Sequence, residues 1–471
     1  MQQENLQKNL SKKHTTMKTI MEPARELKVR AEVDVLVVGA GPAGLIAAEA
    51  AAKDKNLKVM LIEQRGYMGG NLTIGLPILS FLGPKGDQVV KGAAQKFIDR
   101  MWAKGAASAH YPCKNHMSFT IIDPDQTKTV AWEMMDDAGV EVLLYVFVAD
   151  TIVENGKIKG VIIESKAGRE GILAKTVIDC TGDGDVAFRA GVECNKGDEN
   201  GGMQPPTLMF CMRGVETQKL RDAICNEPEK YDMDVMPISQ FRKDKFITVG
   251  LRGRILEAQE KGYKVPVART ILITGLANDE IWVNMTRVSG VDATNPVSYT
   301  QGEHDARVQM YEVMAYLKDF VPGFKNSWLE HSAPFMGIRE TRVIVGKYVM
   351  TAKDILEQKR FDDAIAVAGY PVDIHHAKGG DCTMLFCEDA YQIPYGVLVP
   401  QTVEGLLVAG RCSAMDHEAM AATRVMSTCM ALGEAAGVAA RIAIADGVEV
   451  SAVDVAKVQQ ALLENNAYLA L

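Results

Sequence analysis

Two histidines and three arginines in the second half of the chain are the residues best suited to move protons and bind anions. His417 and Arg424 lie seven positions apart, and Arg339 and Arg342 lie three apart in "MGIRETRVIVG". A guanidinium group binds a carboxylate through two parallel hydrogen bonds, and an imidazole titrates near neutral pH. With His375, these residues are candidates for binding and protonating a substrate. The competing interpretation of each arginine is a salt bridge with a neighbouring acid.

The placement of Arg339 and Arg342 depends on local structure. In a helix the two side chains would share a face, and in a strand they would point to opposite sides. A metal site at "DIHHAKGGD" is the other chemistry considered, because His375 and His376 adjoin Asp373. Adjacent histidines with no third ligand at a suitable spacing are weak evidence, so we expect no metal ion.

The elements that must position this chemistry begin with "DVLVVGAGPAGLIAAEAAA". Its apolar run predicts a buried parallel strand, and the alanine-rich stretch predicts a helix whose N-terminus receives phosphates. Gly39, Gly41 and Gly44 fit G-x-G-x-x-G, where the glycines allow a tight turn, approach of a pyrophosphate and close helix packing. "KVMLIE" predicts a second strand that ends at Glu63, where a ribose-binding acid is expected. This acid disfavours NADP, but the motif alone does not separate FAD from NAD.

Further elements follow the same logic. "YMGGN" allows either close approach to a cofactor or a simple turn. "GDQVVKGAAQKFIDRMWAKGA" and "DPDQTKTVAWEMMDDAGV" predict helices, and the Asn-Gly pair in "ENGKIKGVIIES" predicts a hairpin. "KTVIDCTGDGDVAFRAG" predicts a strand that runs into a Gly/Asp-rich loop. "EGLLVAGRC" predicts a late buried strand, and the small-residue stretch after it predicts a long helix or helix pair that stops at Gly447.

The predicted fold class is α/β, with a Rossmann-type FAD-binding domain and an inserted α+β substrate or cap domain. Residues 194–339 mix strand-like and helical pieces and have the size of the inserted domain. The Rossmann-type domain is discontinuous, over residues 31–193 and 340–450. Residues 1–30 are expected to form a loose arm, and residues 451–471 a C-terminal helix.

Bulk properties narrow the class of protein. The chain has 471 residues and a formal net charge of −8, which argues against broad binding to nucleic acid. No apolar run approaches membrane-spanning length, and the N-terminal stretch lacks an apolar signal core. Nine cysteines are scattered without C-x-x-C. This pattern indicates a reducing compartment and hence a cytoplasmic protein.

Taken together, "VIDCTGDGDVA", "RETR", "YPVDIH", "IPYGVLVP", "LLVAGRCSA" and "TRVMSTCMALGEAAG" resemble the FAD-dependent oxidoreductases of the glutathione-reductase-type Rossmann superfamily. The resemblance covers nearly everything after residue 32 and implies FAD as the cofactor. In many flavoproteins an acid follows the late glycine of this strand, whereas this chain has Arg411. The residues that the resemblance assigns to FAD are Gly39, Gly41, Pro42, Ala43, Gly44, Glu63, Gln64, Arg65, Gly70, Asn71, Val148, Thr181, Gly182, Asp183, Gly410, Arg411, Val425, Met426 and Ser427.

The helix that starts near Val425 would direct its positive end at the flavin N1–C2=O edge, where a reduced flavin gathers negative charge. A His-then-Arg arrangement similar to His417 and Arg424 precedes this helix in fumarate-reductase-type flavoproteins, where such residues hold a substrate carboxylate. The resemblance thus adds a positional argument for these two side chains.

The resulting hypothesis is an enzyme that transfers hydride between flavin N5 and a small polar or carboxylated substrate, at a CH–OH/C=O or CH–CH/C=C bond. A flavin monooxygenase is the first alternative. An electron-transfer subunit that docks on a redox protein is the second, and a tRNA-modification flavoprotein is disfavoured by the acidic composition. The inserted domain leaves ample surface for a homodimer.

Overall fold

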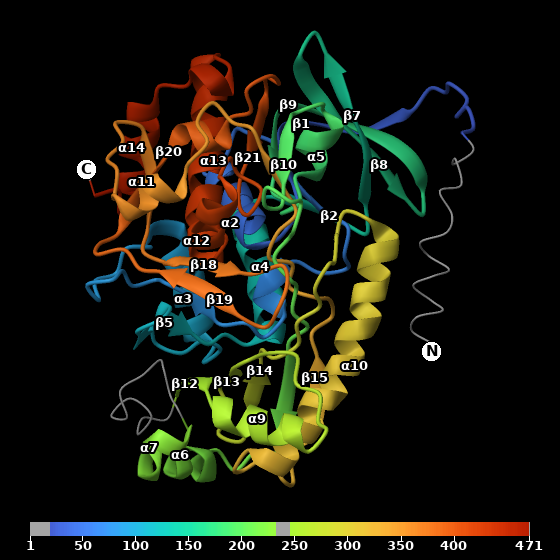
Figure 1. Cartoon of the computed structure of the whole chain (residues 1–471). Coiled ribbons are helices and arrows are strands. Elements are labelled where there is room, and N and C mark those ends of the chain that lie inside the picture. The colour runs from blue at the N-terminus through green and yellow to red at the C-terminus, as the bar shows by residue number, and fades with distance from the viewer. Residues whose placement is uncertain (1–18, 232–244, 471) are drawn as a thin grey trace.

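The chain forms two regions, each with its own hydrophobic core. The computed structural model describes residues 19–231 and 245–470. In Figure 1 a larger α/β region lies above a smaller region of short antiparallel strands, and the long helix α10 (Pro296–Phe320) rises from the smaller region toward the larger one. Most of the predicted N-terminal arm lies outside the described residues, and strand β1 already begins at Lys28.

The larger region is built on a sheet whose central strands are parallel. Their order is β6-β2-β1-β9-β21, and antiparallel strands β8 and β7 extend the sheet beyond β9. Parallel strands end at the same edge, so the loops after β1, β2, β9 and β21 meet there. The strands are β1 (Lys28–Val38), β2 (Val59–Glu63), β6 (Glu141–Leu144), β7 (Phe147–Glu154), β8 (Lys157–Ser165), β9 (Gly168–Asp179) and β21 (Leu406–Val408).

The connection between β7 and β8 is the predicted Asn-Gly hairpin. Asn155 and Gly156 both have positive φ angles, 51° and 76°, which two-residue hairpin turns of this kind require. Strand β9 then pairs with β8 over its first half and with β21 over its last three residues. The hairpin therefore leads directly into a strand that ends at the shared sheet edge.

Helices α2 (Pro42–Ala51) and α13 (Met426–Asp446) pack against each other at backbone distance. A Cβ on Gly433 would lie 2.1 Å from the carbonyl oxygen of Ala43, and one on Gly437 would lie 2.3 Å from another α2 carbonyl oxygen. Only glycine fits at such distances. The alanine- and glycine-rich sequences of both helices are thus explained by their contact.

The predicted helix pair is confirmed as α12 (His417–Thr423) and α13, with Gly447 at the end of α13 in a left-handed conformation. Helix α13 has 21 residues and a mean hydropathy of 1.4 over 18 of them, which suffices to span a membrane by length and composition. This finding corrects the expectation that no apolar run approaches that length. In the structure 72% of that stretch is buried inside the protein, so core packing explains its apolar character.

The smaller region is an antiparallel sheet in the order β12-β13-β14-β11-β15 with helices around it. This confirms the α/β class with an inserted α+β region. Its core also takes in Cys113 and Phe119 from outside residues 194–339. Its elements are β11 (Phe210–Arg213), α6 (Thr217–Asn226), α7 (Pro228–Tyr231), β12 (Ile247–Gly250), α9 (Arg252–Glu260), β13 (Thr270–Thr274), β14 (Ile281–Val283), α10 and β15 (Trp328–Ser332).

Smaller elements complete the structure. A three-stranded sheet of β3 (Ile78–Leu79), β5 (Met117–Thr120) and β4 (Tyr111–Cys113) and a hairpin of β18 (Val372–His375) and β19 (Cys382–Leu385) contribute residues to the cavity described below. The remaining helices and strands are α3 (Gly92–Ala103), α4 (Pro124–Ala138), α5 (Asp185–Arg189), β10 (Cys194–Lys196), β16 (Arg342–Ile344), α11 (Ala352–Leu356), β17 (Ala364–Ala368), β20 (Tyr391–Pro394) and α14 (Val455–Glu464), with 3₁₀ helices at Gly70–Thr73, Tyr395–Leu398 and Val450–Ala452.

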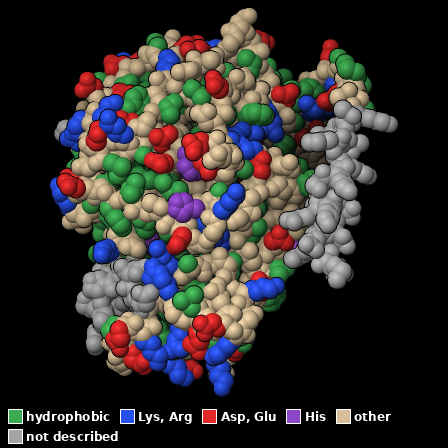
Figure 2. Space-filling model, viewed as in Figure 1, with side chains coloured by type: hydrophobic (Ala, Val, Ile, Leu, Met, Phe, Trp, Pro, Cys, Tyr) green, Lys and Arg blue, Asp and Glu red, His purple; other side chains and the backbone are tan. Residues whose placement is uncertain are grey.

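The surface mixes charges of both signs. On the face drawn in Figure 2, acidic and basic side chains of the described residues are interspersed over both regions, with apolar side chains scattered between them. The excess of acidic residues in the composition is therefore not gathered into one area on this face.

Substitution of Gly433 tests the backbone contact between α2 and α13. We expect Gly433→Ala to lower the free energy of unfolding by about 1–3 kcal/mol, because the new methyl group would collide with backbone of α2. The matched control is Gly253→Ala in α9, where nothing lies within 4 Å of the added Cβ and better helix propensity should keep stability equal or slightly higher. Chemical denaturation measures both, and equal stability of the two variants would contradict the contact.

Candidate functional site

A cavity of about 850 Å³ lies between the carboxyl ends of the parallel strands and the smaller region. This volume is in the upper part of the range of about 300–1,000 Å³ that is typical of ligand sites. All the predicted cofactor-binding residues except Gly44 and Ser427 line it, and so do the predicted catalytic residues Arg339, Arg424 and His375. His417 does not.

The glycine turn after β1 presents backbone to the cavity. Gly39 has a φ of 95°, and a Cβ there would lie 2.6 Å from the carbonyl oxygen of Cys180. Gly44 does not line the cavity because it packs on the turn itself. A Cβ on Gly44 would lie 1.8 Å from the carbonyl oxygen of Gly39. At Gly41 nothing lies within 4 Å of that position. Helix α2 starts here without a side-chain cap, so its first N–H groups are available to an anion.

Glu63 is held at the end of β2 by backbone. It is buried, with one carboxylate oxygen accepting from the N–H of Ala40 and the other from the N–H of Arg65, both at 2.9 Å. Each oxygen keeps a further lone pair. The carboxylate is therefore fixed on the cavity wall with capacity to accept from a ligand hydroxyl.

A buried carboxylate organises the loop after β9. Asp179 is fully buried and accepts hydrogen bonds from three backbone N–H groups and from the hydroxyl of Thr181. Burial raises the pKa of Asp179, and these hydrogen bonds oppose that rise by stabilising the charged form. The folded loop presents Thr181, Gly182 and Asp183 to the cavity.

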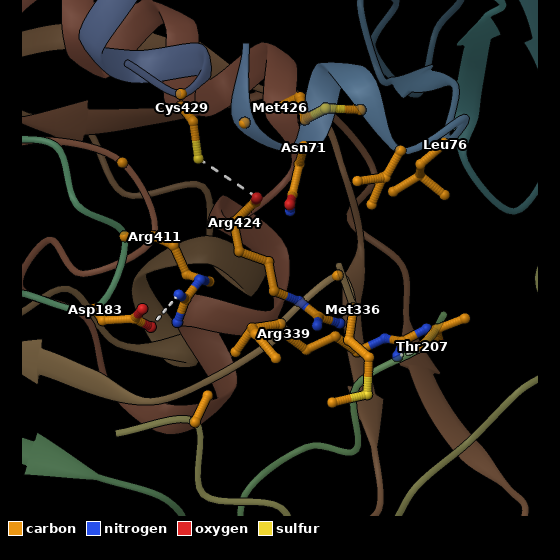
Figure 3. Close-up of a pocket in the computed structure, with 18 of the residues that line it drawn as sticks. Asn71, Leu76, Asp183, Thr207, Met336, Arg339, Arg411, Arg424, Met426 and Cys429 are labelled. Atoms are coloured by element: carbon orange, nitrogen blue, oxygen red, sulfur yellow. Dashed lines mark hydrogen bonds and ion pairs between the residues drawn. The ribbon is translucent and has the colours of Figure 1, made fainter. Parts of the chain in front are cut away.

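Arg411 is paired across the cavity wall. Its Nη2 lies 2.5 Å from Oδ1 of Asp183, and its Nη1 donates to the hydroxyl of Thr341 at 3.0 Å. Figure 3 shows the two charged groups facing each other. Burial by itself would lower the pKa of Arg411, but the charge of Asp183 raises it. The basic residue at the usual place of an acid is thus neutralised by an acid from the neighbouring loop.

Helix α13 begins at the cavity. Val425 and Met426 line it, and the helix has no side-chain cap, so the positive end of the helix faces the cavity. Ser427 does not line the cavity. Its hydroxyl donates instead to the carbonyl oxygen of Leu79 at 2.6 Å, which ties the start of α13 to strand β3.

Three arginines from separate segments meet at another part of the wall. Arg287 follows β14, Arg339 precedes β16 and Arg424 caps the C-terminus of α12, and all three line the cavity. Nη1 of Arg339 donates to the carbonyl oxygen of Pro205 at 2.6 Å and to the hydroxyl of Thr207 at 2.7 Å. In Figure 3 the guanidinium groups of Arg339 and Arg424 reach into the same space. Below, these three side chains are called the arginine cluster.

Arg287 is buried and Arg339 and Arg424 are half-buried, and the charges of the cluster repel one another. Burial and the charge of Arg424 lower the pKa of Arg339 to about 9, which still leaves it protonated at neutral pH. Burial likewise lowers the pKa values of Arg424 and Arg287. Guanidinium groups held together out of water favour an anion as their ligand.

One buried acid faces the cluster. Oδ2 of Asp373 accepts from the hydroxyl of Tyr370 at 3.0 Å and lies 3.4 Å from Nε2 of His375 and 3.9 Å from Nη2 of Arg424. Burial alone would raise the pKa of Asp373, but His375 and Arg424 hold it far below its usual range. Within the described residues Asp373 is the one carboxylate closer than 4 Å to the cluster, and Glu340 and Asp381 act on Arg424 and Arg287 from farther away.

His375 is neutral and fully engaged. Its Nδ1 lies 3.1 Å from Nη1 of Arg287, a group that only donates, and its Nε2 faces Asp373. Burial and the charge of Arg339 lower its pKa to about 4. His375 therefore orients Arg287 and Asp373 and has no ring nitrogen left for a ligand.

His417 and Arg424, the pair seven positions apart, lie in different surroundings. They stand at opposite ends of α12, about 10 Å apart at 1.5 Å per residue. Nδ1 of His417 lies 2.6 Å from Oε1 of Glu340, and this hydrogen bond raises the pKa of His417. Arg342 does line the cavity, but its Nη2 lies 2.5 Å from Asp185. This ion pair agrees with the salt-bridge interpretation of Arg342.

Sequence reasoning did not select Arg287, Tyr370 or His116, all of which line the cavity. Arg287 and His116 are isolated polar residues whose partners lie far along the chain, so no local pattern marks them. Tyr370 is the first residue of "YPVDIH", and its spacing from Asp373 was the one available signal.

Two cysteine thiols also lie on this wall. Cys180 and Cys429 line the cavity, but burial raises the pKa of Cys180 well above its usual value and that of Cys429 to about 12. Within residues 19–231 and 245–470, no three His, Cys, Asp or Glu side chains are grouped to hold a metal ion.

Comparison with known proteins identifies relatives of parts of the chain. Thiamine thiazole synthase of Aeropyrum pernix is 30% identical over 174 residues, which are 35% of this chain and 59% of that protein. The synthase of Methanococcus aeolicus is 32% identical over 32% of this chain and 55% of its own length. The matches thus span less than two thirds of these curated relatives.

Among solved structures, the geranylgeranyl bacteriochlorophyll reductase-like protein of Thermoplasma acidophilum is similar over 93% of this chain and 84% of its own, with a TM-score of 0.51 and 16% identity. A likeness at this identity concerns the fold alone. The model of the FAD dependent oxidoreductase family matches residues 34–462. The chain therefore belongs to the FAD-dependent oxidoreductase family, and its cofactor is FAD.

Proposed function

We propose that the cavity holds the FAD, from Glu63 at the end of β2 to the start of α13. The support is a fit between the wall and the chemistry of the cofactor. Two helices without side-chain caps begin on this one cavity, and the Cβ position of Gly41 opens into free space. Backbone N–H groups at a helix N-terminus beside an open glycine suit a diphosphate.

The proposed holding residues follow from their places on the wall. Glu63 would accept from the ribose, and the turn at Gly41 with the loop after β9 would bind the diphosphate. The positive end of α13 would stabilise negative charge on the reduced ring. The residues of this proposed site that line the cavity are Gly39, Gly41, Pro42, Ala43, Glu63, Gln64, Arg65, Gly70, Asn71, Val148, Thr181, Gly182, Asp183, Gly410, Arg411, Val425 and Met426.

The proposed reaction is oxidation or reduction of a small carboxylated molecule at a CH–OH/C=O or CH–CH/C=C bond. FAD, when bound, accepts or donates a hydride. The arginine cluster is the observation that carries the substrate class, because within the described residues Asp373 is the one carboxylate that lies within 4 Å of its guanidinium nitrogens. A substrate carboxylate would complete the charge balance and be oriented by two-point hydrogen bonds.

Of the alternatives, an electron-transfer subunit needs no small-molecule pocket. A cavity of about 850 Å³ with buried arginines on its wall supports the enzyme instead. A monooxygenase would incorporate one atom of oxygen from O₂ into product, so labelled O₂ with mass spectrometry of the product separates it from the proposed reaction.

Gly41→Val tests the diphosphate position. The new Cβ would have no protein atom within 4 Å, and Gly41 has an ordinary extended backbone with φ −77°. We therefore expect a protein that folds like the original but loses FAD, with affinity lowered by at least about tenfold because the isopropyl group occupies the phosphate path. Absorbance from about 300 to 600 nm and the mass of released cofactor measure FAD, and circular dichroism controls for folding. FAD retained at normal affinity by a folded variant would contradict the site.

Arg339→Gln and Arg424→Gln test carboxylate binding. The FAD-loaded protein is titrated with acetate, succinate and benzoate, and with the uncharged succinamide, while the flavin absorbance is monitored. We expect the native protein to bind at least one carboxylate but not the amide, and each variant to bind it at least about tenfold more weakly. Arg100→Gln, which removes a surface ion pair with Asp137, is the matched control. A native protein that binds no carboxylate, or variants of unchanged affinity, would overturn the substrate class.

A further inference from the structure

His116 is a cavity-lining histidine outside the arginine cluster. It lies in the short turn between β4 and β5 and lines the cavity beside Asn115. The sheet that carries it is tied to the start of α13 by the hydrogen bond from Ser427 to Leu79. The imidazole is therefore mounted on an element that is fixed to the proposed flavin end of the site.

Two contacts orient the ring. Nδ1 of His116 lies 3.3 Å from Sγ of Cys113, and the imidazole stacks on the ring of Tyr370 with centroids 6.2 Å apart and planes 14° from parallel. Nε2 stands on the opposite edge of the imidazole from Nδ1. No hydrogen-bond partner of Nε2 occurs in the described parts of the chain, so this nitrogen is left for a ligand.

The other histidines near the site do not offer a free nitrogen on the cavity. His375 has Nδ1 on Arg287 and Nε2 facing Asp373. His417 does not line the cavity. His110 is also off the cavity, and its two nitrogens are bonded to Thr120 and Gln95. Geometry thus singles out His116.

Electrostatics around the ring agree with this role. The titratable groups that face it are Cys113 from β4, Asp373 from β18 and the stacked Tyr370, with Arg424 beyond Asp373. Burial alone would lower the pKa of His116, but Cys113 and Asp373 raise it. Burial alone would raise the pKa of the Cys113 thiol, but His116 lowers it. The pKa of His116 is thus shifted in the direction opposite to that of His375.

We propose that His116 exchanges a proton with the substrate through Nε2, and that Cys113 is the positioning residue that holds its imidazole. The proposal rests on the proposed function. In reduction of a C=O or C=C bond, the substrate gains a hydride from the reduced flavin at one atom and the Nε2 proton at the other, and His116 is left neutral. In oxidation the substrate loses the same hydride and proton, and Nε2 takes the proton.

The first test uses nuclear magnetic resonance of FAD-loaded protein with labelled histidine. The chain has eight histidines, and His116→Gln assigns the resonance in question. We expect His116 to titrate at higher pH in the native protein than in Cys113→Ala, while His375 stays neutral. We also expect the His116 signal to shift as a bound carboxylate (acetate, succinate or benzoate) saturates the flavin absorbance change. If a carboxylate changes the flavin absorbance but does not shift the His116 resonance, the proposal is overturned.

The second test measures anaerobic flavin bleaching by stopped flow, with the substrate that an anaerobic screen of hydroxy acids and unsaturated acids yields. We expect His116→Gln to slow the half-reaction by about 10²–10⁴-fold, with carboxylate affinity changed by less than about threefold. Cys113→Ser keeps a group that can bond Nδ1 and should retain more rate than Cys113→Ala. The limb of the pH–rate profile that reports His116 should move to lower pH in Cys113→Ala.

Two controls distinguish failure of the proposed function from failure of the proposed role of His116. His304→Gln, on an exposed part of α10, should react at the native rate. If the native protein binds no carboxylate, the proposed function fails and the role of His116 fails with it. If the native protein binds carboxylate and His116→Gln bleaches at the native rate, only the role of His116 is overturned.

Discussion

The contact between α2 and α13 is the constraint on which the rest of the site depends. Gly433 and Gly437 let the backbone of one helix lie where side chains would otherwise hold the two apart. Each glycine costs about 1 kcal/mol of helix propensity relative to alanine. Packing between the two closely spaced helices must therefore offset this cost. Its consequence is that two helix N-termini, each with about half a positive charge, begin on one cavity.

Charge is distributed unevenly along that cavity. At the glycine turn and at the start of α13 the positive potential comes from backbone, because Asp183 neutralises Arg411. Full positive charges are gathered instead in the arginine cluster, beside the buried acid Asp373. In the proposed function, this arrangement would separate a cofactor section, where dipoles meet a diphosphate, from a substrate section, where guanidinium groups meet a carboxylate.

Asp373 also lies close to both cavity histidines, His375 and His116, whose pKa values differ. Its carboxylate faces His375, whose pKa is lowered by burial and by Arg339, while its charge helps to raise the pKa of His116 from the other side. The pKa values of two imidazoles on one cavity are thus shifted in opposite directions. Such divergence between neighbouring titratable groups is characteristic of acid–base sites.

The sequence by itself determined the α/β class, the glycine turn with Glu63, the Asn-Gly hairpin and the helix pair that ends at Gly447. These features are local, since each depends on residues within a few turns of one another. It also placed Arg339, Arg424 and His375 among the candidates. Only the tertiary structure decided that His417 pairs with Glu340 while Arg287, Tyr370 and His116 reach the cavity. Those choices depend on contacts between segments far apart in the chain, which no local spacing encodes.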